Sequence, residues 1–335
     1  MVNLDPQAEK YLQAFNQMPP IHTMDHRTVR EMLSKAPQLP IESEVLAKVE
    51  DFMIPVGKET EIKCRVYTPE GQGPFPLFIY YHGGGWVLGD LEASDLSCRM
   101  LAHVTGCIVV SVNYRLAPEH KFPTPVEDAY AAVEWVYEKG SSFNGDVSRL
   151  VVGGDSVGGN LATVVTMMAR DRKGPDISAQ VLIYPATNLE FNTESHQTFA
   201  KGFGLDRELL FWFRNHYLRQ EEDKYNGYAS PLMAEDASRL PTAFVITAEN
   251  DVLRDEGMAY VERLKASGVS VEYGCAAGMI HGYFANMAVF SKNIEWTVSR
   301  INEFLQSTDV ITNSNTKIKK CKNCSDCKKK HHMAP

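Results

Sequence analysis

The sequence Gly-Asp-Ser-Val-Gly at residues 154–158 constrains the fold of this 335-residue chain more than any other feature. It follows the apolar run 150–152 and precedes a helix-like segment at 160–170. A Gly-x-Ser-x-Gly sequence between a strand and a helix is typical of a tight turn, in which glycine lets the backbone bend while Ser156 stays accessible. The alternative is an ordinary glycine-rich turn with a solvated serine. The pentapeptide alone leaves both interpretations open.

A second glycine-rich motif lies upstream, His-Gly-Gly-Gly-Trp at residues 82–86, directly after a strand-like run. Three consecutive glycines are costly in conformational entropy, and they leave backbone N–H groups uncovered. Such groups stabilise the negative charge that forms on oxygen when an ester carbonyl is attacked. We therefore predict an oxyanion hole made by the N–H groups of Gly83, Gly84 and Val157, the residue after the serine, with Gly85 shaping the turn. A flexible glycine hinge is the alternative.

The serine needs a base, and His281 is the best candidate. A serine hydroxyl becomes a good nucleophile when an imidazole, itself oriented by a carboxylate, removes its proton. In folds that carry this strand–turn–helix motif, the three catalytic residues follow one another along the chain in the order Ser, Asp or Glu, and His. His281 follows the alternating run 269–273 and lies in a glycine-flanked loop. His196 and His216 lie in a polar, aromatic-rich stretch, and we interpret them as surface or pocket-lining residues.

Three acidic residues compete for the third position. Residues 242–247 form an apolar run typical of a buried strand, and Asp251 lies just beyond it. The acid of such a triad belongs on the loop directly after its strand, which favours Asp251. Glu249 and Asp255 are the alternatives. Asp255 begins a helix-like segment, where an acid has the ordinary role of compensating the helix dipole.

Together these motifs resemble the hormone-sensitive-lipase family of α/β-hydrolases, a group rich in carboxylesterases and marked by HGGG and GDSxGG. The likeness covers about residues 45–305, and beyond the two glycine motifs it is carried by residues 112–119, 122–132, 230–232, 251–257 and 281–282. The resemblance implies the same triad of Ser156, Asp251 and His281. Two departures are visible: Val157 stands where the family more often has Ala, and Val252 stands where Pro commonly follows the acid.

The rest of the chain fits one catalytic domain. Strand-like runs alternate with helical stretches, which predicts a mostly parallel sheet covered by helices, and the resemblance makes this an α/β-hydrolase fold. We expect this domain to span residues 46–308. Residues 1–45 are typical of polar amphipathic helices, and an aromatic-rich insertion at about 189–228 interrupts the alternation. The resemblance implies that these two segments form a helical cap over the active site.

Some aromatic and apolar side chains are candidates for the substrate pocket. Most aromatic residues of the insertion are expected to be core residues of a surface helix. The resemblance implies that others face the substrate, and we name Trp86, Phe203, Leu205 and Phe211.

These residues predict a serine carboxylesterase that hydrolyses short- to medium-chain carboxylic esters through an acyl-enzyme. An amidase or lactonase would use the same groups, because a fold does not determine its substrate. A non-catalytic ligand-binding protein on this scaffold is the second class, and the intact Ser, Asp and His argue against it. The mechanism requires no cofactor, and we expect none.

Charge and composition exclude other partners. Residues 1–312 contain 27 basic and 41 acidic residues, a net charge of −14 that repels nucleic acid. The N-terminus lacks a basic, apolar signal segment, and no run approaches the roughly 18 apolar residues of a membrane span. The cysteines of residues 1–312 fit no disulfide framework. We expect a cytoplasmic protein that binds a small-molecule ester, contacts no membrane, and forms a possible homodimer.

The C-terminal segment 309–335 differs from the rest in being rich in lysine and cysteine. Its potential zinc ligands are Cys321, Cys324, Cys327, His331 and His332. The segment has few apolar residues and lacks a second, spaced group of ligands. This composition favours disorder or residues appended for expression, so we predict no metal site.

Overall fold

A computed structural model describes residues 2–35 and 43–311 of the chain. Its centre is an eight-stranded sheet in the order β1-β2-β4-β3-β5-β6-β7-β8. The six strands from β4 to β8 in this order run parallel to one another, while β2 runs antiparallel to both β1 and β4. The predicted α/β-hydrolase architecture with a mostly parallel sheet is confirmed. The strands are β1 (Lys48–Pro55), β2 (Glu61–Thr68), β3 (Phe75–Tyr81), β4 (Ile108–Val112), β5 (Gly145–Asp155), β6 (Ala179–Ile183), β7 (Thr242–Asn250) and β8 (Val271–Ile280).

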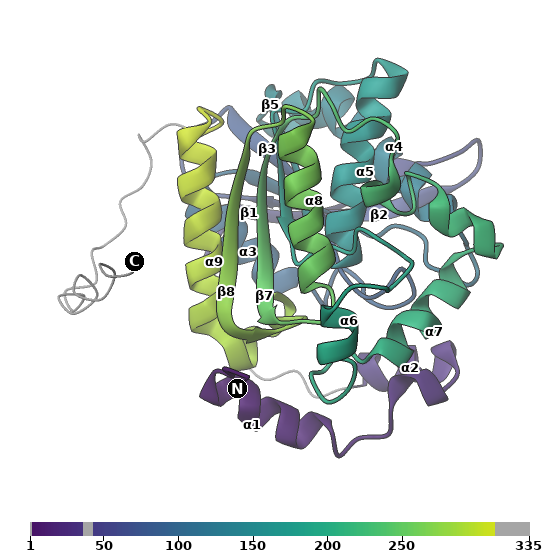
Figure 1. Cartoon of the computed structure of the whole chain (residues 1–335). Helices are drawn as coiled ribbons and strands as arrows, with labels where there is room; N and C mark the ends of the chain where they lie inside the picture. Colours follow the sequence, from purple (N-terminus) through teal and green to yellow (C-terminus); the bar gives the residue numbers. More distant parts are fainter. Residues whose placement is uncertain (1, 36–42, 312–335) are drawn as a thin grey trace, which may run out of the picture.

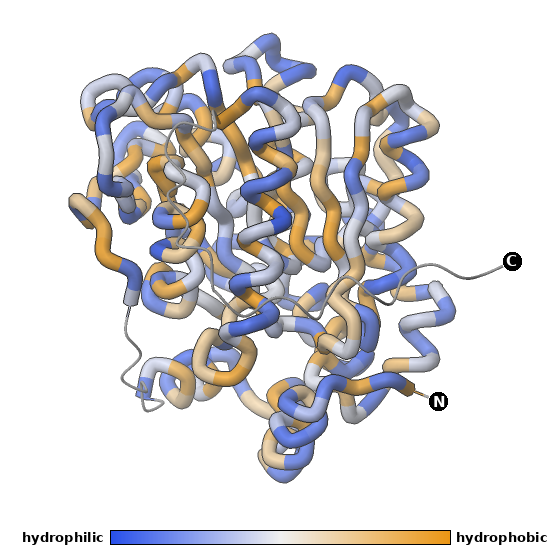
Figure 2. The backbone as a smooth tube through the Cα atoms, turned by 90° about the vertical axis from the view of Figure 1, so that its left-hand side faces the viewer, coloured by the Kyte–Doolittle hydropathy of each residue, from blue (hydrophilic) through white to orange (hydrophobic). Residues whose placement is uncertain are grey.

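Helices cover both faces of the sheet (Figure 1). The helices α4 (Thr124–Lys139), α5 (Val157–Arg172) and α8 (Arg254–Ala266) pack on one face, and α3 (Asp95–Thr105) and α9 (Met287–Ser307) pack on the other. A hydrophobic core lies on each face of the sheet, and the strand sequence explains both. Side chains alternate between faces, so Leu77 and Ile79 of β3 belong to one core while Phe78 and Tyr80 belong to the other. Because both faces are buried, the central strands are continuously apolar, as the orange tube segments of Figure 2 show.

Four short helices gather at the end of the sheet where β5 leads into Ser156 (Figure 1). They are α1 (Pro6–Phe15) and α2 (His26–Ser34) from the N-terminal segment, and α6 (Ser195–Thr198) and α7 (Arg207–Tyr217) from the insertion. Both N-terminal helices begin at an aspartate whose side chain accepts a backbone N–H of the first turn. The two segments predicted to form the cap therefore lie side by side over one end of the molecule.

The folded core extends slightly beyond the boundary predicted at residue 308. Val310 and Ile311 are only 3% and 6% exposed, and Arg149 Nη1 donates to the carbonyl oxygen of Val310 at 3.3 Å. The cysteines and histidines of the C-terminal segment lie outside the described residues. Within the residues that are described, no helix combines the length and apolar character needed to cross a membrane.

Candidate active site

The turn between β5 and α5 places Ser156 in a strained conformation. Its φ is 58° and its ψ is −120°, in a region that residues with a side chain rarely adopt. The glycine at position 158 is explained by a close approach of backbone, because a Cβ there would collide with the carbonyl oxygen of Tyr81. The serine is 7% exposed and lines a mostly apolar cavity. The turn is thus the tight strand–helix connection that the glycine spacing predicts.

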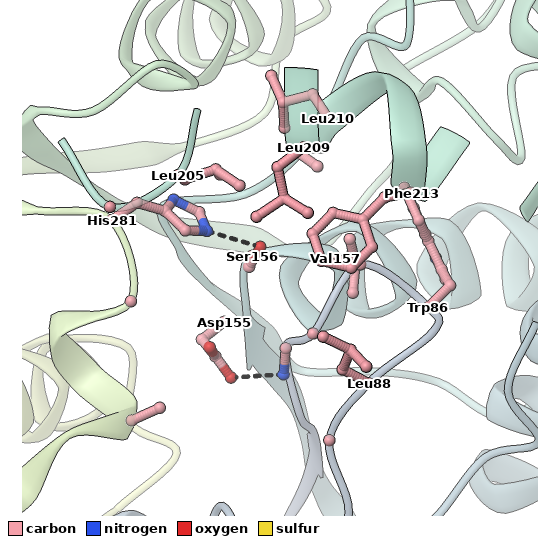
Figure 3. A pocket seen from close by; sticks show the side chains of 18 of the residues that line it. Trp86, Leu88, Asp155, Ser156, Val157, Leu205, Leu209, Leu210, Phe213 and His281 are labelled. Atoms are coloured by element: carbon pink, nitrogen blue, oxygen red, sulfur yellow. Dashed lines mark hydrogen bonds between the residues drawn. The ribbon is translucent and has the colours of Figure 1, made fainter. Parts of the chain in front are cut away.

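Ser156, His281 and Asp251 form one chain of hydrogen bonds. His281 Nε2 lies 2.8 Å from Ser156 Oγ (Figure 3), and His281 Nδ1 lies 2.7 Å from Asp251 Oδ2. A carboxylate only accepts, so Nδ1 carries the proton and Nε2 is free to accept the serine hydroxyl. Asp251 directly follows β7 and is 1% exposed, and its second oxygen accepts the N–H of Leu253 at 2.9 Å. The fold therefore brings together the three residues named from the sequence.

The competing acids have other partners. Glu249 Oε2 accepts the N–H of Gly278 at 2.6 Å, which ties the end of β7 to β8. Asp255 Oδ2 accepts the N–H of Ser195 at 2.8 Å, and its other oxygen pairs with Arg254. Both acids thus support the loops around the site, and neither contacts His281.

The interpretation of His196 as a surface or pocket-lining residue is wrong. Its side chain is fully buried, and Nε2 lies 3.1 Å from Glu256 Oε2, which is also fully buried. Burial raises the pKa of Glu256, while His196 and two backbone N–H groups oppose that shift. The other alternative, His216, is half-buried, packs on Trp212 and His26, and does not line the cavity. The sequence carried no sign of the buried pair, because its two members are 60 residues apart.

The glycine loop differs from the prediction in one donor. The N–H of Gly83 donates to Asp155 Oδ1 at 2.9 Å, so it is already engaged (Figure 3). Within the described chain, the N–H groups of Gly84, Gly85 and Val157 donate to no protein acceptor. Gly84 and Gly85 have φ values of 113° and 65°, which glycine adopts at low cost. The free donors of this loop are therefore shifted by one residue along the chain.

His82, which opens the glycine loop, has a structural role. Burial lowers the pKa of His82, although its hydrogen bond to the Gly83 carbonyl opposes this shift. The ring is therefore neutral near pH 7, with Nδ1 2.7 Å from that carbonyl oxygen and its face stacked on Tyr114. The imidazole thus holds the loop without adding a charge to the site.

A cavity of about 310 Å³ opens beside Ser156, and its lining is mostly apolar. Trp86 and Leu205 line it as predicted, but Phe203 and Phe211 do not. Phe203 packs edge-on against Phe199, with ring centroids 5.0 Å apart. Phe211, also in α7, packs edge-on against Phe191, with ring centroids 5.5 Å apart. The helix presents a different set of side chains to the cavity (Figure 3): Leu209, Leu210 and Phe213.

The N-terminal helices also contribute to the lining, which residue-by-residue analysis of the sequence missed. The lining residues are Tyr11 and Phe15 of α1, Ile21 between the two helices, and Leu33 of α2. The available signal was the amphipathic pattern of residues 1–45, whose apolar positions need a partner surface. In the described part of the chain, no group of three or more His, Cys, Asp or Glu side chains is arranged to hold a metal ion.

Comparison with known proteins places this geometry among ester hydrolases. The family model described as "alpha/beta hydrolase fold" matches residues 78–285. The carboxylic ester hydrolase LipN of Mycobacterium tuberculosis is 43% identical over 241 residues, which cover 70% of this chain and 64% of LipN. An arylesterase of Saccharolobus solfataricus is 36% identical, over 84% of this chain and 93% of its own. The solved structure of a hyperthermophilic esterase from the archaeon Pyrobaculum calidifontis is 42% identical with a TM-score of 0.84, and the match covers 93% of this chain and 100% of that one.

Proposed function

Because the chain belongs to the hormone-sensitive-lipase-like family of α/β-hydrolases, we propose that it is a serine carboxylesterase whose nucleophile is Ser156. His281 acts as the general base and Asp251 holds it in the required tautomer. The observation that carries this proposal is the continuous hydrogen-bond chain from Ser156 Oγ through His281 to Asp251 Oδ2. The names of the relatives support esters, rather than amides, as the substrate class.

The reaction proceeds in two halves. His281 Nε2 takes the hydroxyl proton as Ser156 Oγ attacks the ester carbonyl carbon, and the same nitrogen then protonates the departing alkoxide. A water molecule next gives its proton to His281 and attacks the acyl-enzyme, which releases the carboxylic acid and restores the serine. Asp251 stays ionised and stabilises the imidazolium that forms in each half.

The negative oxygen of each tetrahedral intermediate requires aimed donors. We assign these donors to the N–H groups of Gly84, Gly85 and Val157, since Gly83 is occupied by Asp155. Val157 begins α5, so the positive end of the helix dipole adds to the stabilisation. Each well-placed donor contributes about 3 to 4 kcal/mol to the transition state.

The size of the cavity favours short- to medium-chain acyl groups. Its volume of about 310 Å³ lies at the lower end of the range for small-molecule sites. Bulky side chains from α7 and from Trp86 close it on one side. A long acyl chain would have to displace these side chains, which are packed against the core.

The central test is the variant Ser156→Ala, assayed on chromogenic esters of graded acyl length together with a matched anilide and a lactone. We expect wild-type turnover of the esters and no turnover by the variant, with an unchanged melting temperature. Ester turnover that survives in folded Ser156→Ala would refute the proposed nucleophile. Faster turnover of the anilide or the lactone would instead assign the protein to the amidase or lactonase class. Tight ester binding without turnover by the wild type would indicate a binding protein.

We also propose that the enzyme is a cytoplasmic homodimer. The buried free thiols of Cys64, Cys98 and Cys107 support a reducing compartment. Strand β8 is an edge of the sheet, its residue Tyr273 is 38% exposed, and an edge strand offers unpaired backbone groups to a second copy. Sedimentation equilibrium should give twice the chain mass, and Tyr273→Lys should shift it toward the monomer. Activity confined to membrane or secreted fractions of the source cells would contradict the location.

A further inference from the structure

The loop that follows β3 has a backbone that needs support from outside. Four of its residues have positive φ: Gly84, Gly85, Trp86 and Gly89. Trp86 is the exception among them, because it carries a side chain and still has a φ of 59°. A residue with a side chain keeps such a conformation only when its surroundings hold it there. The loop is therefore not fixed by its own sequence alone.

Two carbonyl groups of the loop are held by residues from elsewhere in the chain. The carbonyl oxygen of Trp86 accepts the N–H of Ala117 at 2.8 Å. The carbonyl oxygen of Val87 accepts Nε of Arg30 at 2.8 Å. Arg30 also donates from Nη2 to the carbonyl oxygen of Ala117 at 2.7 Å. A single guanidinium thus joins the loop to the segment that supports it.

Arg30 is itself anchored, and it comes from the cap. It lies in α2, and its two terminal nitrogens donate to the two carboxylate oxygens of Glu119 at 2.9 and 3.0 Å. His26, one turn earlier in α2, lies 3.3 Å from the same carboxylate. This fork-to-fork geometry is specific to arginine, since a lysine cannot occupy two carboxylate oxygens and two carbonyls at once.

The ion pair persists across ordinary assay conditions. Burial acts to raise the pKa of Glu119, but hydrogen bonds from Arg30 and from the backbone N–H of Glu119, together with the charges of Arg30 and His26, outweigh it and hold the pKa at about 2. A carboxyl group with a lowered pKa stays ionised, and keeps its contribution to stability, until the pH falls toward that pKa. Between pH 5 and pH 9 the anchor of Arg30 is therefore charged and intact.

We propose that Arg30 is a positioning residue for catalysis: from the cap, it holds the backbone of Trp86 and Val87 so that the N–H groups of Gly84 and Gly85 face the developing oxyanion. This inference rests on the proposed esterase function. Helix α2 then has two roles. It lines the substrate cavity through Leu33, and through Arg30 it stabilises the loop that follows β3. Loss of the guanidinium would leave the triad in place but misalign the donors.

The test is Arg30→Ala in the full-length chain, with Arg27→Ala as the matched control. Arg27 lies in the same helix and is exposed. We expect kcat/KM of Arg30→Ala on a short-chain ester to fall about 10- to 100-fold, mainly through kcat, because small misplacements of oxyanion donors cost about this much. Arg27→Ala should stay within about twofold of the wild type, since surface substitutions have small effects.

A transition-state analogue separates positioning from general loss of structure. A trifluoromethyl ketone forms an oxyanion with the serine, whereas the matching methyl ketone binds without one. Arg30→Ala should weaken the fluorinated inhibitor by the same factor as kcat/KM and leave the methyl ketone unchanged. Equal weakening of both ketones, or no weakening of either, would overturn the proposal.

Milder variants cover the case in which Arg30→Ala does not fold. Arg30→Lys keeps the charge but loses the fork, and Glu119→Gln keeps Arg30 but weakens its anchor. We expect kcat/KM of both variants to lie between those of Arg30→Ala and the wild type. Added guanidinium should restore part of the activity of Arg30→Ala, at concentrations below those that denature the wild type. Wild-type behaviour of Arg30→Lys would overturn the proposal. An inactive wild type, or an active Ser156→Ala, would instead defeat the esterase assignment and is distinguishable from these outcomes.

Discussion

The carboxylate of Asp155 accepts a hydrogen bond from the backbone N–H of Gly83 at 2.9 Å, joining the residue before the nucleophile to the glycine loop. The same oxygen accepts the hydroxyl of Tyr80 at 2.7 Å, and the second oxygen lies 3.4 Å from the hydroxyl of Tyr184. Tyr184 in turn packs against the ring of His281, with centroids 4.7 Å apart. A single buried side chain thus contacts the loop that supplies donors and a ring that supports the base.

This arrangement predicts that Asp155→Asn impairs catalysis. Asparagine has the same shape as aspartate, but its amide nitrogen donates hydrogen bonds and does not accept them. At one of the two oxygen positions it would face groups that now donate to the carboxylate, such as the N–H of Gly83, so the glycine loop would shift. We expect kcat/KM to fall about 10- to 100-fold in steady-state assays. Asp146→Asn, at the other end of β5, is the control and should change kcat/KM by less than about twofold. Equal losses in both variants would show that the effect is not specific to the loop.

The three acids near the site should differ sharply in kinetics. Asp251→Asn is expected to lower kcat by about 10⁴-fold, because the amide would donate to Nδ1 and favour the wrong tautomer of His281. Asp255→Asn and Glu249→Gln change acids that do not contact His281, so each should cost less than about tenfold. If either of these variants were the inactive one, the assignment of the acid would be wrong.

Acyl-chain preference should follow the face of α7 that lines the cavity. We expect the best kcat/KM on acyl chains of about two to six carbons, with a gain of at most about fourfold per buried methylene and a steep fall beyond about eight to ten carbons. Phe213→Ala should move the optimum to longer chains, because Phe213 lines the cavity. Phe211→Ala should leave the optimum in place, because Phe211 does not line the cavity. A shift with Phe211→Ala alone would contradict the assigned wall.

The end of the folded core should be visible in truncation experiments. Truncation after Ile311 should leave the melting temperature and turnover close to those of the full chain. Truncation after Thr308 removes Val310 and Ile311, which are buried, and should lower the free energy of unfolding by about 2 to 5 kcal/mol. Denaturant titration measures the free energy of unfolding of each truncated chain. Identical values for the two truncated chains would show that Val310 and Ile311 add nothing to the core.

Local sequence was sufficient for the parts of this protein that depend on a few neighbouring residues. The tight turn at Ser156 was predicted from the Gly-x-Ser-x-Gly pattern between an apolar run and a helix-like segment. The carbonyl oxygen that requires glycine at position 158 belongs to Tyr81 of β3, so that contact itself is tertiary. Apolar runs and their spacing predicted a mostly parallel sheet, since both faces of such strands are buried. The order of strands then led to Asp251 and His281, each directly after a strand that is a neighbour in the sheet.

Tertiary structure alone decided which group each of these elements meets. Gly83 was predicted to be a free donor, but Asp155, 72 residues away in sequence, occupies its N–H. Phe211 and Phe213 are equally apolar in sequence, yet only the packing of α7 determines which one reaches the cavity. The pairing of Arg30 with Val87 likewise joins segments 57 residues apart. Backbone preference and periodicity act over a few residues, whereas the partner of a hydrogen bond depends on where distant loops meet, and that is determined by the packing of the whole domain.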